Sequence, residues 1–408
     1  MSVITIYSSV FCQEDLTVKE VVSSTGYQLT TDDELAMEAS RKAGMDQEKI
    51  KRAFSAKTSV FNQFTHEKER SIAHLKLVLA EKLTNDNLLI SGFCTQLIPA
   101  SISHVMRVCL IADQKFRIAV AAENRQLNEK EAVRIIRRED EDRAAWVDYI
   151  HSRKDPWDPD LYDLVIPMGK TTLEQASALI QENALKDVVK PTKTSKSAVA
   201  DFCLTAKVEA ALAQEGHQVA VTTKDGNVHL VINKHVLMLS RLEEELRDIV
   251  NKVPGVIKVE TTTGKDYHKT HIYRKHDFKV PSKVLLVDDE REFAQTLSER
   301  LQLRSMGAAV AYDGESALDL VQDDEPEVMI IDLKMPGIDG IEVLKKVKKT
   351  RPEIEIIVLT GHGADTDKEQ CMQLGAFAYL QKPVDIDELS ETLKKAYEKI
   401  RKGRQSQD

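Results

Sequence analysis

One pattern recurs five times between Lys283 and Ile400 and constrains the fold more than any other feature of the chain. A short apolar run is followed each time by a segment in which apolar residues have helical spacing. Short apolar runs suit strands that are buried on both faces, and the helices between them are the crossovers that parallel strands require. The pattern predicts a doubly wound α/β domain with a five-stranded parallel sheet. The expected strands are 284–287, 308–312, 328–331, 354–359 and 378–381.

Acidic side chains stand directly after two of these strands. Asp288 and Asp289 follow the first strand, and Asp332 follows the third. Ligands of such sheets bind at the carboxyl ends of the strands, so we expect the three carboxylates to meet there. They would repel one another unless a hard cation lay between them. Mg²⁺ takes oxygen ligands and keeps several of its waters, so the sequence predicts a magnesium site at this edge of the sheet.

Two more polar side chains end neighbouring strands of the same sheet. Thr360 follows the strand 354–359, and Lys382 follows the strand 378–381. A hydroxyl and an ammonium at these places could each hold a phosphoryl oxygen. A single acid after a strand is often only a helix cap. Four such elements, in order at four strand ends, are not explained in that way.

This constellation resembles the response regulator receiver family over about residues 283–400. The matching stretches are VDDE at 287–290, DLKMPGIDG at 332–340, LTG at 359–361 and KP at 382–383. The resemblance implies a flavodoxin-like fold in which Asp332 accepts a phosphoryl group from a histidine kinase or a phosphotransfer protein. It further implies Mg²⁺ held by Asp288, Asp289, Asp332 and the backbone carbonyl of Lys334, phosphoryl contacts from Thr360 and Lys382, a switch aromatic at Tyr379 and a cis Lys382–Pro383 bond.

The N-terminal stretch, residues 1–185, is predicted to form a second α/β domain, with strands at 3–7, 88–91, 105–111 and 164–167. Its segments EAVRIIRREDEDR and DP…YDLVI resemble the cytidylate kinase-like family of P-loop nucleotide kinases over about residues 1–182. In that family, arginines of this region close over the transferred phosphoryl group. The resemblance therefore implies that Arg138 and Arg143 contact a nucleotide or phosphate.

The phosphate-binding loop departs from that family. A P-loop needs GxxxxGK[ST] after the first strand, whereas here VITIY is followed by SSVFCQEDLTVKEVV. The first glycine is Gly26, and Glu14 and Asp15 stand where a lysine would reach the phosphates. Three interpretations of the arginines stay open. They form a solvated helix face with the acids at 139–141, they retain a site for a phosphorylated ligand, or they serve active phosphoryl transfer.

A small α+β module is predicted between these domains, at residues 198–264. Helices are expected at 201–212 and 237–253, and strands at 219–223, 228–232 and 256–261, which gives the order αββαβ. The stretches DGNVHLVI and VPGVIKVE resemble a BON-type module, and a spacer or interaction role is favoured. Polar stretches at 186–200 and 261–283 are interpreted as linkers, and the receiver domain is expected at 282–402.

Composition excludes several classes of function. From Lys283 onward there are 18 basic and 26 acidic side chains, a net charge of −8, and the rest of the chain carries −1. No domain is basic enough for a DNA-binding output module. Aromatic residues are only 5%, which argues against a stacking surface for single-stranded nucleic acid. No apolar run reaches the roughly 18 residues that would span a membrane, and the N-terminus lacks signal-peptide features, so a cytoplasmic protein is expected.

The favoured hypothesis is a signalling protein whose receiver is phosphorylated and acts through non-DNA-binding N-terminal domains on an output protein that the sequence does not identify. The alternative is a phosphorylation-regulated nucleoside monophosphate kinase with cytidylate-like specificity, although the altered loop argues against kinase activity. A third hypothesis is an adaptor whose receiver only mediates dimerisation. The intact acids, Thr360 and Lys382 argue against that role, but a homodimer through the receiver stays open.

Overall fold

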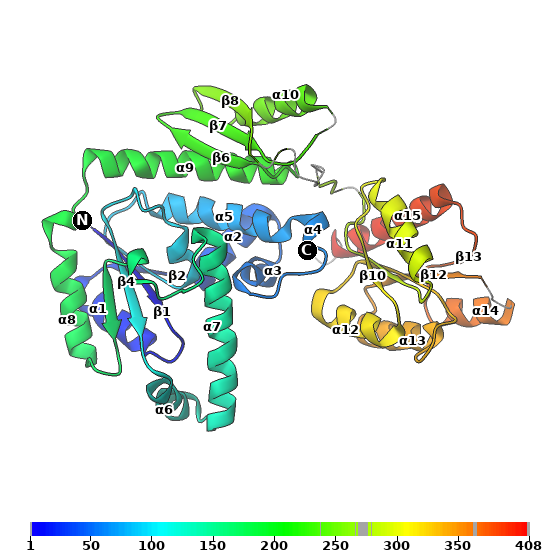
Figure 1. The fold of residues 1–408 in the computed structure, drawn as a ribbon, viewed down its shortest axis with the longest axis horizontal. Helices are drawn as coiled ribbons and strands as arrows, with labels where there is room; N and C mark the ends of the chain where they lie inside the picture. Colours follow the sequence, from blue (N-terminus) through cyan, green and yellow to red (C-terminus); the bar gives the residue numbers. More distant parts are fainter. Residues whose placement is uncertain are drawn as a thin grey trace. The chain divides into compact units, whose positions relative to one another are not determined.

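The computed structural model describes residues 2–236, 238–265, 267, 276–278, 280–361 and 365–405. The chain forms two compact units (Figure 1). The first, called the N-terminal unit below, consists of Met1–Thr58 and Glu67–Arg274, and the second, called the receiver unit, of Ser59–His66 and Lys275–Asp408. Eight residues from the N-terminal half of the sequence therefore belong to the C-terminal unit.

A five-stranded parallel sheet forms the centre of the N-terminal unit, in the order β2-β3-β1-β4-β5. The four strands predicted from apolar runs are confirmed. Gln28–Thr31, by contrast, is a strand that the sequence analysis missed, because QLTT has no apolar run and lies at the sheet edge. The strands are β1 Val3–Ser8, β2 Gln28–Thr31, β3 Leu88–Ser91, β4 Val105–Ile111 and β5 Leu164–Pro167.

Helices cover both faces of this sheet, and the side chains of β1 point alternately toward the hydrophobic cores on the two faces. Ile4 and Ile6 pack with α1 (Glu14–Thr25) and α8 (Leu173–Ala184), whereas Val3 belongs to the core on the other face. That second core is formed mainly by α2 and α5. The remaining helices of this domain with their bounds are α2 Asp32–Ala43, α3 Gln47–Lys51, α5 Glu67–Lys82, α6 Gln114–Arg125 and α7 Glu129–His151.

The middle module has the predicted order αββαβ. Its sheet pairs β6 with β7 antiparallel and β7 with β8 parallel. Asp225 and Gly226, with φ of 49° and 80°, connect β6 to β7, and two positive φ values are typical of a tight type I′ hairpin turn. The elements are α9 Lys193–Gln214, β6 Ala220–Lys224, β7 Asn227–Ile232, α10 Leu239–Val250 and β8 Lys258–Thr263. Leu237, the expected start of the second helix, lies outside the described residues.

The first predicted linker is wrong over residues 193–200, because α9 begins there. Thr192 and Ser195 form a capping box, and polar residues of this kind suit a helix start as well as a linker. The 22-residue helix then runs between the middle module and α5 (Figure 1). Of the second predicted linker, residues 266, 268–275 and 279 lie outside the described residues.

Helix α9 contributes to two hydrophobic cores at once. Val199 and Phe202 pack with the N-terminal domain, while Leu204 and Val208 pack with the sheet of the middle module. The two predicted domains thus share one helix within a single compact unit. The boundaries 1–185, 198–264 and 282–402 stay a prediction.

The receiver unit contains the predicted five-stranded parallel sheet, in the order β10-β9-β11-β12-β13. All four residues of β9 and of β11 are buried, as expected for inner strands covered on both faces. The strands are β9 Val284–Val287, β10 Ala308–Ala311, β11 Val328–Ile331, β12 Glu355–Thr360 and β13 Ala378–Gln381. The helices are α11 Arg291–Gln302, α12 Gly314–Asp324, α13 Gly340–Thr350, α14 Asp365–Gln373 and α15 Ile386–Gln405.

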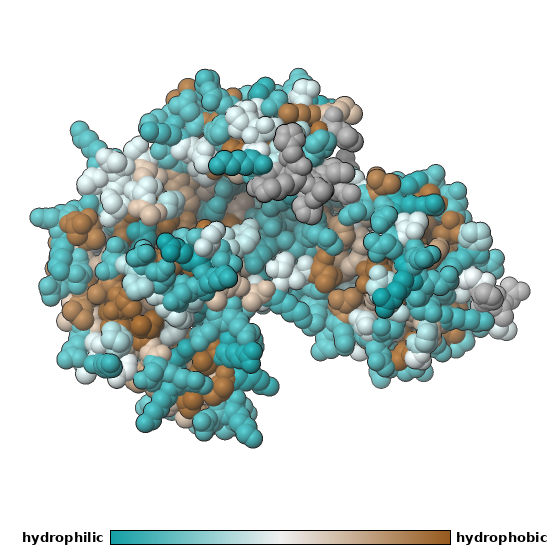
Figure 2. Space-filling model, viewed as in Figure 1, coloured by the Kyte–Doolittle hydropathy of each residue, from teal (hydrophilic) through white to brown (hydrophobic). Residues whose placement is uncertain are grey.

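Hydrophilic residues cover most of the surface visible in Figure 2, with apolar residues in scattered patches. Among the residues that the structure describes, no helix is both long and apolar enough to cross a membrane.

The shared helix α9 generates a stability prediction. Phe202 is only 6% exposed, so Phe202→Ala should reduce the free energy of unfolding of this unit by about 3–5 kcal/mol. Lys207→Ala, on the exposed side of the same helix, should change it by less than about 0.5 kcal/mol. Tryptophan fluorescence during urea unfolding is a suitable measurement, because the two tryptophans, Trp146 and Trp157, both lie in this unit. Equal unfolding midpoints for the two variants would contradict the packing.

Candidate functional site

Three carboxylates meet at the carboxyl ends of two neighbouring strands. Strand β9 leads into Asp288 and Asp289, and strand β11, which pairs with β9, leads into Asp332. The backbone N–H of Asp332 donates to the carbonyl of Val287 at 3.0 Å, which continues the ladder and fixes the acid beside its neighbours. One carboxylate oxygen from each acid lies within 4.8 Å of the others. The sequence-predicted acids are therefore brought together.

The ammonium group of Lys382 lies among these acids. Its Nζ is 2.6 Å from Oδ2 of Asp288 and 2.8 Å from Oδ2 of Asp332. It is also 3.3 Å from Oε1 of Glu290 and 4.4 Å from the ring centre of Phe293. Only 11% of the lysine side chain is exposed. Short distances and burial make these ion pairs stronger than pairs on an open surface.

Burial and ion pairing shift the pKa values of Asp288 and Lys382 in this site. Burial raises the pKa of Asp288, and the hydrogen bond and charge of Lys382 oppose that rise. Burial acts to lower the pKa of Lys382, but hydrogen bonds to Asp288 and Asp332 outweigh it, so the pKa is raised and the ammonium stays charged. Three carboxylates against one ammonium leave an excess of negative charge, which a divalent cation would neutralise.

The other predicted site residues lie around this cluster. Thr360 is the last residue of β12 and is buried, and its carbonyl accepts a hydrogen bond from the backbone N–H of Lys382 at 2.9 Å. Tyr379 is half-buried on β13, opposite Val358 of β12. The backbone N–H of Lys334 donates to Oδ1 of Asp332 at 3.3 Å. The Lys382–Pro383 peptide bond is cis, as expected.

A glycine fixes the loop that follows Asp332. A Cβ atom at Gly340 would lie 2.1 Å from the carbonyl oxygen of Asp332, so any other residue would displace that backbone. Gly340 is also the first residue of α13, and the side chain of Asp339 caps this helix by accepting from the N–H of Glu342. The DG pair of the DLKMPGIDG stretch thus brings the start of α13 against the acid-bearing strand end.

In the N-terminal unit, the loop after β1 is held by carboxylate and guanidinium groups. The carboxylate of Glu14, at the start of α1, accepts hydrogen bonds from the hydroxyls of Ser8 and Ser91. Arg143 is buried and donates from Nε to the carbonyl of Ser8 at 2.6 Å. Arg138, by contrast, lies on the surface of α7 and pairs with Glu139 at 3.2 Å. The structure therefore brings Arg143 to the loop and leaves Arg138 away from it.

A second loop-binding arginine was missed from the sequence. Buried Arg117 donates from Nε to the carbonyl of Val10 at 2.8 Å, and its two terminal nitrogens bind both carboxylate oxygens of Asp140. The bidentate pair fixes the guanidinium plane. The position of Arg117 soon after a strand was the weak sequence signal for it. Its partner Asp140 could not be predicted, because it lies 23 residues further along the chain on another helix.

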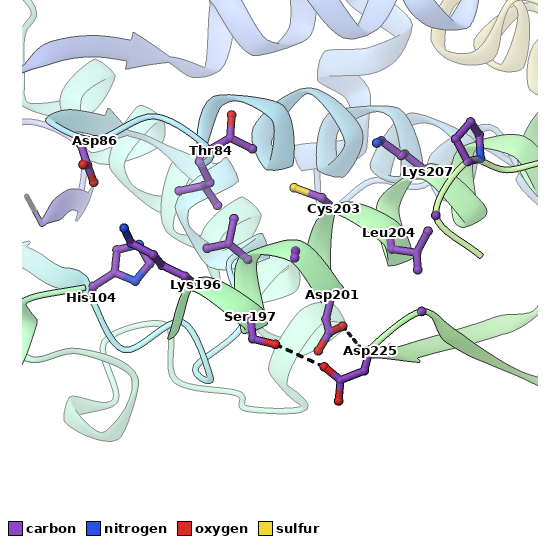
Figure 3. Close-up of a pocket in the computed structure, with 16 residues that line it drawn as sticks. Thr84, Asp86, His104, Lys196, Ser197, Asp201, Cys203, Leu204, Lys207 and Asp225 are labelled. Carbon is purple, nitrogen blue, oxygen red and sulfur yellow. Dashed lines mark hydrogen bonds between the residues drawn. The ribbon is translucent and has the colours of Figure 1, made fainter. Parts of the chain in front are cut away.

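The N-terminal unit also contains a cavity of about 580 Å³ beside α9 (Figure 3). Lys196, Lys207 and His104 contribute to its lining, as do Asp201 and Asp225, so both signs of charge are present. Oδ1 of Asp201 accepts from the backbone N–H of Asp225 at 2.8 Å, an interaction that joins α9 to the β6–β7 turn (Figure 3). The mixed lining selects no class of ligand by charge.

Comparison with known families agrees with this geometry. Residues 284–394 match the response regulator receiver domain, and residues 3–170 match the cytidylate kinase-like family. The chain thus has a receiver domain at its C-terminal end and a cytidylate kinase-like domain at its N-terminal end. Neither match covers residues 198–264, so the resemblance of the middle module to BON-type modules stays a prediction.

Solved receiver domains are similar to a part of the chain. One from a Francisella response regulator is 33% identical, over 29% of this chain and 98% of its own, with a TM-score of 0.28. One from Clostridium thermocellum is 31% identical, over 28% and 94%, with a TM-score of 0.28. One from Methanospirillum hungatei JF-1 is 26% identical, over 29% and 96%, with a TM-score of 0.29.

Receiver domains in general bind Mg²⁺, and the acids of this chain fit such an ion. Three carboxylate oxygens within 4.8 Å of one another offer hard oxygen ligands on one side, and among the described residues Lys382 is the ammonium that pairs with Asp288 and Asp332. Asp288, Asp289 and Asp332 are the side chains that would hold the ion.

The electrostatics of this cluster generate a titration prediction. Lys382→Met should raise the pKa of Asp288 further, because the hydrogen bond and the positive charge that oppose the effect of burial are both removed. Lys334→Met is the control, since this exposed lysine follows Asp332 by two residues without a side-chain contact to Asp288 among the interactions described. Carboxylate titration by ¹³C NMR measures both variants. An unchanged pKa of Asp288 in Lys382→Met would contradict the ion pair.

Proposed function

We propose that the protein is a response regulator that accepts a phosphoryl group on Asp332 in the presence of Mg²⁺. The observation that carries this proposal is the convergence of Asp288, Asp289, Asp332 and Lys382 at one end of a receiver-family sheet. The donor is a histidine kinase or a phosphotransfer protein. The signal passes through the N-terminal domains, which lack the basic charge of a DNA-binding output, to a protein partner.

The chemistry is a phosphoryl transfer between two side chains. A carboxylate oxygen of Asp332 attacks phosphorus, a P–O bond forms, and the P–N bond of the donor phosphohistidine breaks to release imidazole, which takes up a proton. Lys382 already lies 2.8 Å from Asp332 and is placed to contact an incoming phosphoryl oxygen. A bound Mg²⁺ ion, held also by the carbonyl of Lys334, would neutralise charge on the phosphoryl group.

The response to phosphorylation is proposed to pass through the ends of β12 and β13. The added negative charge attracts the hydroxyl of Thr360, and the space that it leaves admits the ring of Tyr379. Tyr379 pairs in register with Val358, two residues before Thr360 on the neighbouring strand, and both side chains are at least half-buried, so we expect movement of Thr360 to change the packing around Tyr379. This is a shift in population between two packings rather than a new structure.

The phosphorylation prediction concerns Asp332 directly. The full chain should take up phosphate from acetyl phosphate when Mg²⁺ is present, and a chelator should prevent uptake. Asp332→Asn should abolish labelling, because an amide cannot act as the carboxylate nucleophile. Asp339→Asn, which alters an exposed helix cap seven residues along, should label as wild type does. Intact mass spectrometry is the measurement. Labelling of Asp332→Asn at the wild-type level would contradict the proposal that Asp332 accepts the phosphoryl group.

Nucleoside monophosphate kinase activity is the alternative, and the loop after β1 argues against it. Glu14 and Asp15 stand in the sequence where a phosphate-binding lysine would be expected, and the carboxylate of Glu14 accepts hydrogen bonds from Ser8 and Ser91. Arg117 and Arg143, the two buried arginines nearest the loop, are engaged with its carbonyl oxygens and with acids. Phosphoryl transfer depends on positioning and charge stabilisation, and neither the lysine nor a glycine is present in this loop.

We therefore expect the full chain to show neither micromolar Mg-ATP binding by calorimetry nor turnover of CMP in a coupled assay. Glu14→Lys should not restore either, because the loop would still lack glycines and its carbonyl oxygens would stay bound to arginines. Removal of one well-placed catalytic donor costs about 3 kcal/mol of barrier, and here several are missing. Tight ATP binding together with steady CMP turnover would favour the enzyme instead.

A further inference from the structure

Residues 59–66, called the clip below, are separated from the receiver domain by more than 200 positions in sequence and yet pack within its unit. Their neighbours on both sides, Thr58 and Glu67, belong to the N-terminal unit. The chain therefore leaves one unit, contributes eight residues to the other and returns. The receiver family match covers residues 284–394 only, so the clip is an addition to the family fold.

The clip is a folded turn rather than an extended strap. The carbonyl of Ser59 accepts from the N–H of Asn62 at 3.0 Å, and the hydroxyl of Thr65 donates to the carbonyl of Phe61 at 3.2 Å. A short helix, α4 (Asn62–Thr65), ends at His66 with φ of 48°. This local structure presents Phe61 and Phe64 as a pair and lowers the entropy lost on docking.

Four contacts attach the clip to the receiver. Phe61 is completely buried in the core that contains Ala317 and Val321 of α12. Phe64 lies against Gly307, where an added Cβ would be 2.3 Å from the Cβ of the phenylalanine. The N–H of Val60 donates to Oδ2 of Asp324 at 3.3 Å, and Nδ1 of His276 lies 3.1 Å from the carbonyl of Phe64. The interface thus combines an aromatic anchor with polar contacts around it.

The clip docks at the end of the sheet that lies away from the acids. Gly307 immediately precedes β10, and Asp324 ends α12 shortly before β11, so both mark the amino ends of strands. Asp288 and Asp332 follow the carboxyl ends of β9 and β11. β10 is also the edge strand opposite β13, which carries Tyr379. The contacts of the clip with Gly307 and Asp324 therefore lie at the amino end of the sheet, while Phe61 and Tyr379 pack against the same hydrophobic cluster.

We propose that the amino end of the receiver sheet is a binding surface for the clip and that the clip stays bound whether or not Asp332 is phosphorylated. The receiver is then attached to the N-terminal part of the chain by this docked turn as well as by the covalent connection before β9. Because the clip is tethered, docking is an intramolecular event and needs little intrinsic affinity. The contacts of the clip with Gly307 and Asp324 do not involve β12 or β13.

The test displaces the clip without touching the acids. Gly307→Val puts a side chain where Phe64 lies, and the backbone of Gly307 is outside the left-handed region, so it accepts a side chain. Phe64→Asp alters the clip and leaves the receiver sequence intact. Gly403→Val is the matched control, since a Cβ at this position in α15 meets no atom within 4 Å. All three are made in the full chain.

Amide hydrogen exchange followed by mass spectrometry is the first readout, without a phosphodonor. Residues 59–66 should exchange at least about tenfold faster in Gly307→Val and Phe64→Asp than in wild type or Gly403→Val, while β9 and β11 keep their protection. Unchanged exchange of the clip in both variants would overturn the docking surface. This readout does not depend on Asp332. Clip docking can therefore fail while the proposed phosphorylation stands, and phosphorylation can fail while clip docking stands.

Labelling by acetyl phosphate is the second readout. Phe64→Asp should label within about twofold of wild type, because the clip lies at the far end of the sheet from Asp332. Phosphorylation of wild type should change amide exchange of residues 59–66 by less than about twofold. Loss of protection in β9 and β11 of Phe64→Asp would show that the clip is an integral part of the receiver fold, and would overturn the proposal. Amide exchange of residues 59–66 that becomes about tenfold faster on phosphorylation would contradict the proposal that the clip stays bound in both states.

Discussion

The ammonium of Lys382 lies among the carboxylates of Asp288, Glu290 and Asp332, and the charge balance of the receiver site depends on these ion pairs. Strands β9 and β11 are buried on both faces, so the fold forces Asp288 and Asp332 together at their ends. Repulsion between them is tolerated because the lysine binds both at less than 3 Å. The negative charge that remains favours a cation at this site, and under the proposed function a bound cation together with Lys382 would favour a phosphoryl group. Acidic residues alone would repel such a group.

The arrangement of this site could be predicted from the sequence because the acids follow buried parallel strands, and Thr360 and Lys382 mark the ends of the next two strands. Four apolar runs of the receiver were placed to within one residue at each end, and the fifth, β12, was displaced by one residue. The periodicity of the pattern fixes the strand ends, and the ends fix the acids. Where that signal is weak, prediction failed: β2 has the sequence QLTT, and the start of α9 has the polar composition of a linker.

Contacts between residues far apart in the chain could not be predicted in the same way. Phe61 is an apolar residue in a polar neighbourhood, and nothing in its local pattern indicates that it is buried against α12. Arg143 and Arg138 belong to the same charged helix, and only the folded backbone distinguishes them by turning Arg143 toward the carbonyl of Ser8. Local sequence gives the elements, whereas the choice among equivalent side chains depends on tertiary packing.

The loop after β1 illustrates how a nucleotide-kinase-like domain can be stable without its ligand. A phosphate-binding loop presents backbone N–H groups to an anion and uses a lysine to balance its charge. Here the carboxylate of Glu14 supplies negative charge from within the chain, and the hydroxyls of Ser8 and Ser91 bind it. Phe11 and Gln13 take positive φ values of 61° and 57° that glycine would adopt more readily, and Arg117 and Arg143 hold the neighbouring carbonyl oxygens. The polar groups of this loop are thus satisfied by other groups of the chain itself, which is why the proposed function does not rely on nucleotide turnover by this domain.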